Sequence, residues 1–182
     1  AMAQGHTRVV TCGGVNSNHA RATAIACRRL GLEPYLWLRG EDRDPPSGNL
    51  LLDKFVQAKL RFVTHDQWKD RRTALPMWAQ DLGGAYVVVE GGSDALGSLG
   101  YADAADEILA QCADSQVSLR RVVHACGSGG TAAGLAMGFA RAGADVEVIA
   151  VAVCNARAYF ERVIERIFDE AEERGWLSTE HR

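Results

Sequence analysis

Two turns between an apolar strand and a helix hold most of the polar side chains that could do chemistry in this sequence. The first follows the β-branched run that begins at Arg8 and contains Asn16, Ser17, Asn18 and His19. In parallel α/β sheets, ligands gather at the carboxyl ends of the strands, where such a turn lies. Ser17 or Asn18 could instead cap the helix that follows, because the first helical amides have no intrahelical partner. Capping accounts for only one of the four residues, so the cluster favours a ligand site.

The second turn is rich in glycine and has the composition of an anion-binding loop. It follows a strand that ends near Cys126 and consists of Gly127, Ser128, Gly129, Gly130 and Thr131. Unobstructed backbone amides and the positive end of a helix dipole together bind anions, and phosphate is a common occupant of such loops. The turn therefore predicts a phosphate site.

Two other phosphate motifs fit this turn poorly. A dinucleotide site would need a third glycine where the chain has Ala132, and an acidic residue after the next strand, which ends at Val153, Cys154 and Asn155. A Walker loop would need a Lys-Ser or Lys-Thr pair after the glycines, and none follows. A nicotinamide-dependent oxidoreductase is thus disfavoured, and a small phosphate group fits better than a dinucleotide.

A third glycine-rich stretch, Glu90 to Gly100, could either approach a ligand or join two lobes. Taken alone, it favours a connector. No His, Asp or Glu spacing and no C-x-x-C pair predicts a metal site. The five cysteines are therefore expected to be free thiols, mostly buried.

On either side of these turns, short apolar strands alternate with longer segments of helical periodicity. The expected strands are Arg8 to Cys12, Pro34 to Leu38, Leu60 to Thr64, Ala85 to Val89, Arg121 to Ala125 and Val146 to Val151. The expected helices are Asn18 to Leu30, Gly48 to Ala58, Asp66 to Leu82, Ser98 to Cys112, Gly130 to Ala142 and Ala156 to Gly175. This order predicts an α/β fold of parallel sheets with helices on both faces.

The connector divides the chain into two lobes. Residues 1–95 are expected to form a small α/β lobe with the first turn, and residues 96–182 part of a larger lobe with the glycine-rich turn. The second lobe receives only two strands, too few for a sheet whose faces and edges all need cover. The second lobe is therefore expected to be incomplete.

Composition excludes several classes of function. The 20 Lys and Arg residues against 23 Asp and Glu give a formal net charge of −3, which offers no basic surface to nucleic acid. No apolar run reaches the roughly 20 residues that span a membrane, and the first residues lack the order of a signal peptide. The sequence is interpreted as a cytoplasmic globular protein that binds neither nucleic acid nor membrane.

Four segments, taken in order, give the sequence a resemblance to one enzyme family. They are GGVNSNHARATA from Gly13, GNLLLD from Gly48, EGGSDALGSLGY from Glu90 and GSGGTAAGL from Gly127. The sequence resembles the D-cysteine desulfhydrase and 1-aminocyclopropane-1-carboxylate deaminase family, which has the tryptophan synthase β-like fold of type II pyridoxal-phosphate enzymes. The resemblance covers nearly the whole chain.

The resemblance implies roles for the residues of both turns. Ser17 would meet the substrate carboxylate or take part in proton transfer, and Asn18 would bond the ring hydroxyl of pyridoxal 5′-phosphate. Asn16, where the family usually has glutamine, would line the substrate site. His19 matches the desulfhydrase form of the motif, which makes it a second catalytic candidate and favours D-cysteine or a similar β-substituted amino acid. The turn from Gly127 to Thr131 matches the phosphate loop that binds the cofactor.

The sequence departs from the family in lacking the lysine that forms a Schiff base with the cofactor. In the family this lysine lies some tens of residues before the serine motif, whereas only 16 residues precede Ser17, none of them lysine. Lys54, Lys59 and Lys69 match no family lysine motif. The family's carboxyl-terminal third also has no counterpart, so the chain is interpreted as a central portion, truncated at both ends.

The leading hypothesis is a pyridoxal-phosphate-dependent C–S lyase or deaminase acting on small amino acids, of which this chain alone would be inactive. The chain could be a fragment of such an enzyme, a truncated gene product or a protein completed by another chain. The alternative is a non-catalytic module of the same fold that binds a phosphate ligand or an amino acid. Members of the family are commonly dimers, so a homodimer is expected.

Overall fold

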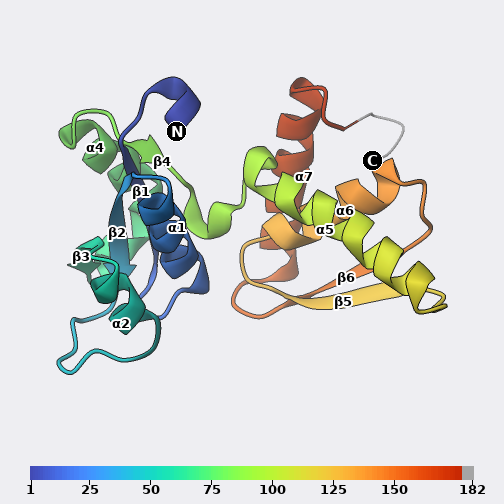
Figure 1. Ribbon diagram of the computed structural model, residues 1–182, viewed down its shortest axis with the longest axis horizontal. Helices are drawn as coiled ribbons and strands as arrows, with labels where there is room; N and C mark the ends of the chain where they lie inside the picture. Colours follow the sequence, from blue (N-terminus) through green and yellow to red (C-terminus); the bar gives the residue numbers. More distant parts are fainter. Residues whose placement is uncertain (178–182) are drawn as a thin grey trace. The chain divides into compact units, whose positions relative to one another are not determined.

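The computed structural model describes residues 1–177, which divide into two compact units between Gly91 and Gly92. Residues 178–182 of the expected second lobe lie outside the described residues. Each unit has its own parallel sheet and its own helices (Figure 1). The α/β class expected from the alternation of strands and helices is confirmed.

The first unit holds a four-stranded parallel sheet with the order β3-β2-β1-β4 (Figure 1). Its strands are β1 (Arg8–Gly14), β2 (Glu33–Arg39), β3 (Lys59–Val63) and β4 (Tyr86–Val87). Its helices are α1 (Asn18–Arg29), α2 (Gly48–Phe55), α3 (His65–Lys69) and α4 (Arg71–Asp81), with 3-10 helices at Met2–Gln4 and Glu90–Gly92. Strand β1 has a partner on each side, so the turn that follows it begins from the interior of the sheet.

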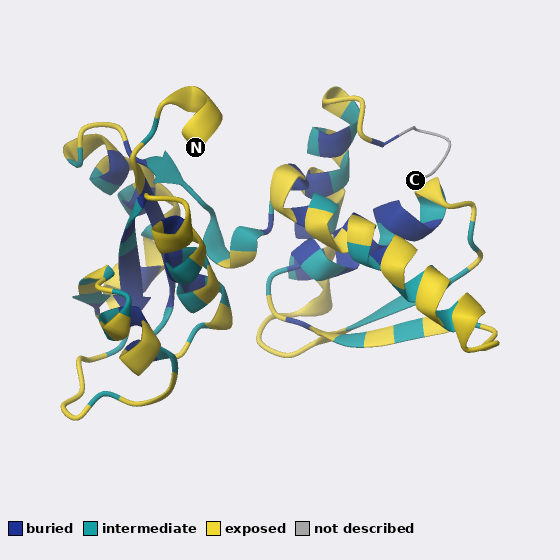
Figure 2. Ribbon diagram, in the orientation of Figure 1, coloured by how far each residue is buried: buried dark blue, intermediate teal, exposed yellow. Residues whose placement is uncertain are grey.

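Helices cover both faces of this sheet. One face packs on α3 and α4 through Val10, Cys12, Trp37 and Val63. The other packs on α1 and α2 through Leu36, Leu38, Leu60 and Phe62. Figure 2 shows β2 buried along much of its length. Each fully buried aliphatic side chain contributes about 1.5–3 kcal/mol to the stability of the folded state. The packing on both faces therefore holds β1, and the turn that follows it, in place.

The second unit has a two-stranded parallel sheet and three helices. The strands are β5 (Arg121–Cys126) and β6 (Glu147–Ala152), and the helices are α5 (Ala95–Asp114), α6 (Gly130–Arg141) and α7 (Arg157–Glu173). Helices α5 and α6 approach closely because glycine occupies the contact. A Cβ at Gly134 would lie 2.2 Å from the Ser98 carbonyl oxygen, and one at Gly138 would lie 2.4 Å from the Ala102 carbonyl oxygen.

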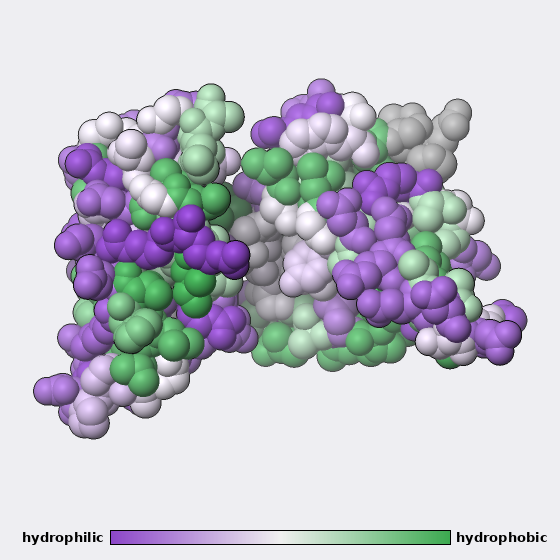
Figure 3. Space-filling model, in the orientation of Figure 1, coloured by the Kyte–Doolittle hydropathy of each residue, from purple (hydrophilic) through white to green (hydrophobic). Residues whose placement is uncertain are grey.

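Within the described residues, the helices of the second unit cover one face of its sheet. Val122 and Val148 pack beneath Leu135 of α6, whereas Val123 and Val151 on the opposite face are 63% and 50% exposed. Figure 2 draws both strands as intermediate or exposed except at the end of β5, where Cys126 is buried, and Figure 3 shows hydrophobic surface along their edge of the unit. The expectation of an incomplete second lobe is confirmed. None of the helices in residues 1–177 combines the length and hydrophobicity of a membrane span.

The expected single helix from Asp66 to Leu82 is wrong, because two helices occupy this segment. Thr64 and Gln67 form a capping box at the start of α3. Helix α3 ends at Asp70 (φ −90°, ψ 7°), where the Arg71 guanidinium donates to the Trp68 carbonyl oxygen at 3.2 Å. Both helices present apolar side chains to the same core, so one helical periodicity runs across the break.

The helix expected to begin at Ser98 begins instead at Ala95. Asp94 caps it, since one carboxylate oxygen accepts a hydrogen bond from the Gly97 amide at 2.7 Å. Gly97 and Gly100, which suggest a loop in the sequence, therefore lie inside α5. Glycine is required at position 97 because a Cβ there would lie 1.9 Å from the Gly92 carbonyl oxygen.

Candidate active site

Ser17 is the residue that caps α1 in the turn after β1. Its Oγ accepts a hydrogen bond from the Ala20 amide at 3.1 Å. A Cβ at Gly13 would lie 2.5 Å from the Ser17 Cβ, so glycine at the end of β1 lets Ser17 pack against the strand. Because the cap uses a lone pair and not the proton, the Ser17 hydroxyl can still donate a hydrogen bond.

Asn49, at the start of α2, holds the two asparagines of this turn. Its side-chain amide nitrogen donates to the Asn16 carbonyl oxygen at 2.7 Å and to the Asn18 Oδ1 at 3.0 Å. Its own Oδ1 accepts from the Arg21 guanidinium at 3.4 Å. A carbonyl can only accept and a guanidinium can only donate, so these two partners fix which end of the Asn49 amide points where.

The orientation of Asn49 in turn fixes that of Asn18. Since the Asn49 nitrogen is a donor, the Asn18 atom facing it is the carbonyl oxygen, and the Asn18 NH₂ is directed elsewhere. Glycine at position 48 leaves room for the Asn16 side chain, because a Cβ there would lie 2.9 Å from the Asn16 Oδ1. The turn therefore presents two donors, the Ser17 hydroxyl and the Asn18 amide, which suit an acceptor or anionic ligand.

His19 is anchored to the sheet through Thr11 of β1. The His19 Nε2 lies 2.8 Å from the Thr11 Oγ1, which donates to the Val88 carbonyl oxygen at 2.8 Å. Burial lowers the pKa of His19 below its ordinary value of 6.5, against the weaker raising effect of the Glu90 carboxylate. The ring is therefore neutral at physiological pH.

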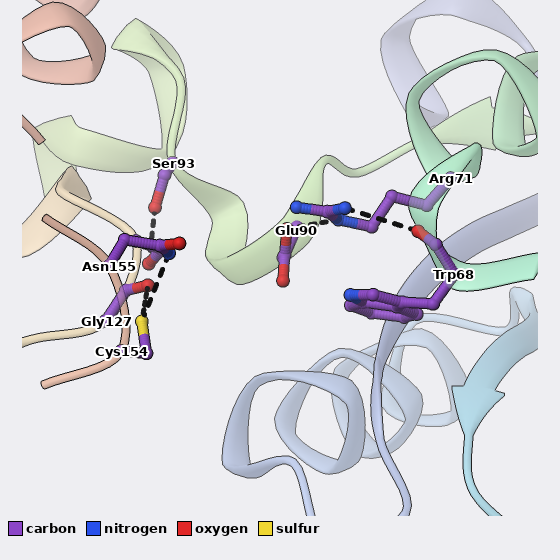
Figure 4. A network of polar contacts seen from close by, with 8 residues as sticks. Trp68, Arg71, Glu90, Ser93, Gly127, Cys154 and Asn155 are labelled. Atoms are coloured by element: carbon purple, nitrogen blue, oxygen red, sulfur yellow. Dashed lines mark hydrogen bonds and ion pairs between the residues drawn. The ribbon is translucent and has the colours of Figure 1, made fainter. Parts of the chain in front are cut away.

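Glu90 lies near the turn as half of an ion pair. Its carboxylate is 2.6 Å from the Arg71 Nε, and the same guanidinium lies 5.1 Å above the Trp68 ring (Figure 4). Burial, with a smaller contribution from Glu90, raises the pKa of the Cys12 thiol to about 12. Cys12 is thus a neutral core residue, as expected for a buried thiol.

In the second unit, the turn between β5 and α6 is built to keep its backbone clear. Gly129 has φ +93°, and a Cβ there would lie 3.0 Å from Val163. A Cβ at Gly130 would lie 2.8 Å from the Ser93 Oγ. Helix α6 has neither a side-chain cap nor an acidic residue in its first turn. Apart from the Gly130 amide, which donates to the Ser93 Oγ, its first amides remain available to an anion.

Ser93 and Cys154 brace this turn from either side (Figure 4). The Ser93 Oγ accepts from the Gly130 amide at 3.2 Å and donates to the Ser128 Oγ at 2.8 Å. The Cys154 thiol, just after β6, donates to the Gly127 carbonyl oxygen at 3.3 Å. With its lone pair engaged by Ser93, the Ser128 hydroxyl keeps its proton for an outside acceptor.

The three lysines occupy surface positions in the first unit. Lys54 pairs with Asp42, Lys69 pairs with Asp66, and Lys59 is exposed at the start of β3. No group of His, Cys, Asp and Glu side chains in residues 1–177 could hold a metal ion.

The structure thus brings the sequence-predicted residues together in two clusters. Residues 16–19 gather in the first unit around Asn49 and Thr11, and residues 127–131 gather in the second around Ser93. Sequence reasoning gave these three supporting residues no role. Asn49 lies in the GNLLLD segment and Ser93 in the presumed connector, and neither has a spacing that reveals its partner.

Comparison with known proteins gives one family for the chain. Residues 1–178 match the model of the family described as "Pyridoxal-phosphate dependent enzyme". A putative 1-aminocyclopropane-1-carboxylate deaminase of Thermotoga maritima is 39% identical over 180 residues, and a D-cysteine desulfhydrase of Salmonella paratyphi A is 38% identical over 166. These alignments cover 96% and 87% of this chain.

A solved structure agrees with the sequence matches. The crystal structure of an ACC deaminase homologue superposes with a TM-score of 0.81 at 33% identity and covers 98% of this chain. The chain covers 57% of the Thermotoga protein, 50% of the Salmonella protein and 55% of the solved chain. It therefore spans about half the length of the relatives it matches.

Proposed function

The chain belongs to the family of pyridoxal-phosphate-dependent enzymes, and from this premise we propose that it supplies cofactor- and substrate-binding turns of a lyase or deaminase acting on small amino acids. The observation that carries the proposal is the turn from Gly127 to Thr131. Apart from the Gly130 amide, which donates to Ser93, the first amides of α6 remain available, and the bond that Ser128 accepts from Ser93 leaves the Ser128 proton unused. This arrangement fits the phosphate of pyridoxal phosphate.

In this proposal, the amides of the turn other than that of Gly130, together with the Ser128 and Thr131 hydroxyls, would donate hydrogen bonds to the phosphate. Gly127, Gly129 and Gly130 contribute backbone alone. Asn18 would use the NH₂ that its bond to Asn49 leaves unengaged to donate to the cofactor's ring hydroxyl, which is an acceptor when ionised. When bound, pyridoxal phosphate supplies an electron sink for the pair left on the substrate α-carbon after its proton is removed.

The first turn would serve the substrate. The Ser17 hydroxyl, whose proton is not used by the helix cap, can donate to a substrate carboxylate or move a proton. Asn16 would line the same site, and neutral His19 would act as a hydrogen-bonding or proton-transfer group. The relatives named D-cysteine desulfhydrase and 1-aminocyclopropane-1-carboxylate deaminase make D-cysteine and similar small amino acids the substrates to test first. A cytoplasmic homodimer completes the proposal.

None of Lys54, Lys59 and Lys69 is proposed to bond the cofactor. None of the three matches a lysine motif of the family, so we propose that binding by this chain is non-covalent. The lack of a lysine that matches the family motif also supports an alternative, a non-catalytic module that binds a phosphate ligand or an amino acid through the same turns. Release of sulfide from D-cysteine by this chain with added cofactor would exclude that alternative.

A titration with pyridoxal phosphate, followed by absorbance, tests the phosphate turn. Ser128→Ala and Thr131→Val each remove one hydroxyl that donates to a charged acceptor, a bond worth about 1.5–3 kcal/mol. Each should raise the Kd by about tenfold or more. Ser118→Ala, at an exposed site before β5, is the matched control and should leave the Kd unchanged. Inorganic phosphate should compete.

Two results would overturn the proposal. One is an unaltered Kd in both hydroxyl variants, and the other is no detectable binding by the wild-type chain. Borohydride treatment tests the lysine assignment separately. If the reduced sample releases its cofactor on dialysis, binding is non-covalent. A cofactor-modified lysine peptide in the digest would show that one of the three lysines does react.

A further inference from the structure

Thr11 makes an unusual pair of contacts for a residue in the middle of a β-strand. Its side chain is 0% exposed, and its Oγ1 lies 2.8 Å from both the Val88 carbonyl oxygen and the His19 Nε2. Its burial leaves no room for water to replace either partner. Strand β1, the segment after β4 and the first turn of α1 are therefore joined through one hydroxyl.

The single proton of that hydroxyl determines the state of the imidazole. A carbonyl oxygen cannot donate, so a 2.8 Å contact between the Val88 oxygen and the Thr11 Oγ1 requires the threonine proton to lie between them. The Oγ1 then has only lone pairs to offer His19. An Nε2 without a proton at 2.8 Å would set two lone pairs against each other, so Nε2 must carry the hydrogen.

We propose that Thr11 is a positioning residue that fixes His19 as the Nε2-protonated tautomer and leaves Nδ1 as the acceptor of the ring. No hydrogen bond involves Nδ1 among residues 1–177. Resting on the proposed function, this assignment sets the chemistry of the ligand group that His19 can meet. That group must donate a hydrogen bond or a proton, as the ammonium or thiol of a small amino acid does.

The charged groups around His19 are compatible with a neutral ring. The Glu90 carboxylate would favour a second proton on the ring, but it is paired with the Arg71 guanidinium at 2.6 Å. A fully protonated imidazole would donate from both nitrogens and offer no acceptor. The Thr11 contact selects one neutral tautomer of the two, which burial alone does not do.

Nitrogen-15 NMR of the uniformly labelled chain, recorded without cofactor, tests the tautomer directly. In the wild-type protein, the His19 Nε2 should resonate in the protonated, pyrrole-like range and Nδ1 in the unprotonated, pyridine-like range. Thr11→Ser keeps the hydroxyl and should retain this pattern. Thr11→Val keeps the shape, removes the hydroxyl, and should draw the two shifts toward each other as both tautomers become populated.

The wild-type spectrum alone can refute the assignment, so the test does not depend on the fold of the valine variant. A proton on Nδ1 in the wild-type chain overturns it, as does an unchanged Nε2-protonated pattern in a folded Thr11→Val variant. A role for Thr11 in core packing alone would not move the tautomer. The measurement needs no cofactor, so its outcome is separate from that of the pyridoxal phosphate titration.

Discussion

Replacing Asn49 by aspartate should reverse the hydrogen-bonding direction of Asn18. The aspartate is nearly the same size but can only accept, so it loses the bonds to the Asn16 carbonyl and the Asn18 Oδ1. The Asn18 amide is then expected to rotate and donate to the new carboxylate. Its carbonyl oxygen would point outward, where the proposed ring hydroxyl needs a donor.

The size of the effect follows from the bond that is lost. A hydrogen bond to a charged acceptor is worth about 1.5–3 kcal/mol, so Asn49→Asp should weaken pyridoxal phosphate binding about tenfold to a hundredfold. Asn49→Ala frees the Asn18 side chain without reversing it. Re-ordering one side chain costs about 0.5–1.5 kcal/mol, so the alanine variant should bind about two- to tenfold more weakly than wild type.

Absorbance titration gives the three dissociation constants, and Ser47→Asp controls for the added charge. Ser47 is exposed, precedes α2 by one residue and makes no side-chain cap, so the same charge there leaves Asn18 untouched. The expected order of affinity is wild type, then Asn49→Ala, then Asn49→Asp, with Ser47→Asp near wild type. Equal affinity in both Asn49 variants, or equal losses in Asn49→Asp and Ser47→Asp, would show that Asn49 does not set the orientation of the Asn18 amide.

Two further predictions concern stability, and urea unfolding checks both. Gly134→Ala forces a Cβ to within 2.2 Å of the Ser98 carbonyl oxygen and should destabilise the second unit by about 1–3 kcal/mol, whereas Gly100→Ala, with no atom within 4 Å, should not destabilise it. Burial raises the pKa of Asp53 from 3.8 to about 6, and neither carboxylate oxygen has a hydrogen-bond partner in residues 1–177. The folded state therefore binds the proton more tightly than the unfolded state, so stability falls as the pH rises from about 4 to above 6. Asp53→Asn should be more stable than wild type at pH 7.5, by up to about 3 kcal/mol, and similar to it at pH 4, whereas a parallel pH dependence of the two proteins would contradict this account.

Periodicity and turn composition predict the fold well because they reflect local requirements. The six strands fall near their expected positions because β-branched runs and glycine-rich turns constrain short segments. The break at Asp70 escaped prediction because the side chain that supports it, Arg71, acts by bonding a backbone carbonyl. The start of α5 was predicted three residues too late because the glycines near it resemble a loop. Gly97 marks a close contact with the Gly92 carbonyl within a helix, not a flexible loop.

The sequence predicts those residues of the candidate site that are adjacent to one another in the chain. Residues 16–19 and 127–131 stand out as clusters, but Asn49, Thr11 and Ser93 act from 31, 8 and 35 residues away from their partners. A one-dimensional pattern does not record such contacts. These contacts determine which group donates and which accepts in each hydrogen bond. That direction depends on how donors and acceptors are arranged in space.

The contacts made by Asn49, Thr11 and Ser93 concern the binding of a ligand and not the formation of a covalent bond to it. Each positions a side chain by satisfying one end of it, so that Asn18 and Ser128 keep a donor, and His19 an acceptor, for a ligand. None of these contacts involves a lysine, and the glycines of the second turn are constrained by Ser93 and Val163 of their own unit. The turns can therefore keep their geometry whether or not a lysine bonds the cofactor. Binding of the phosphate group and turnover of an amino acid should accordingly be separable properties of this chain.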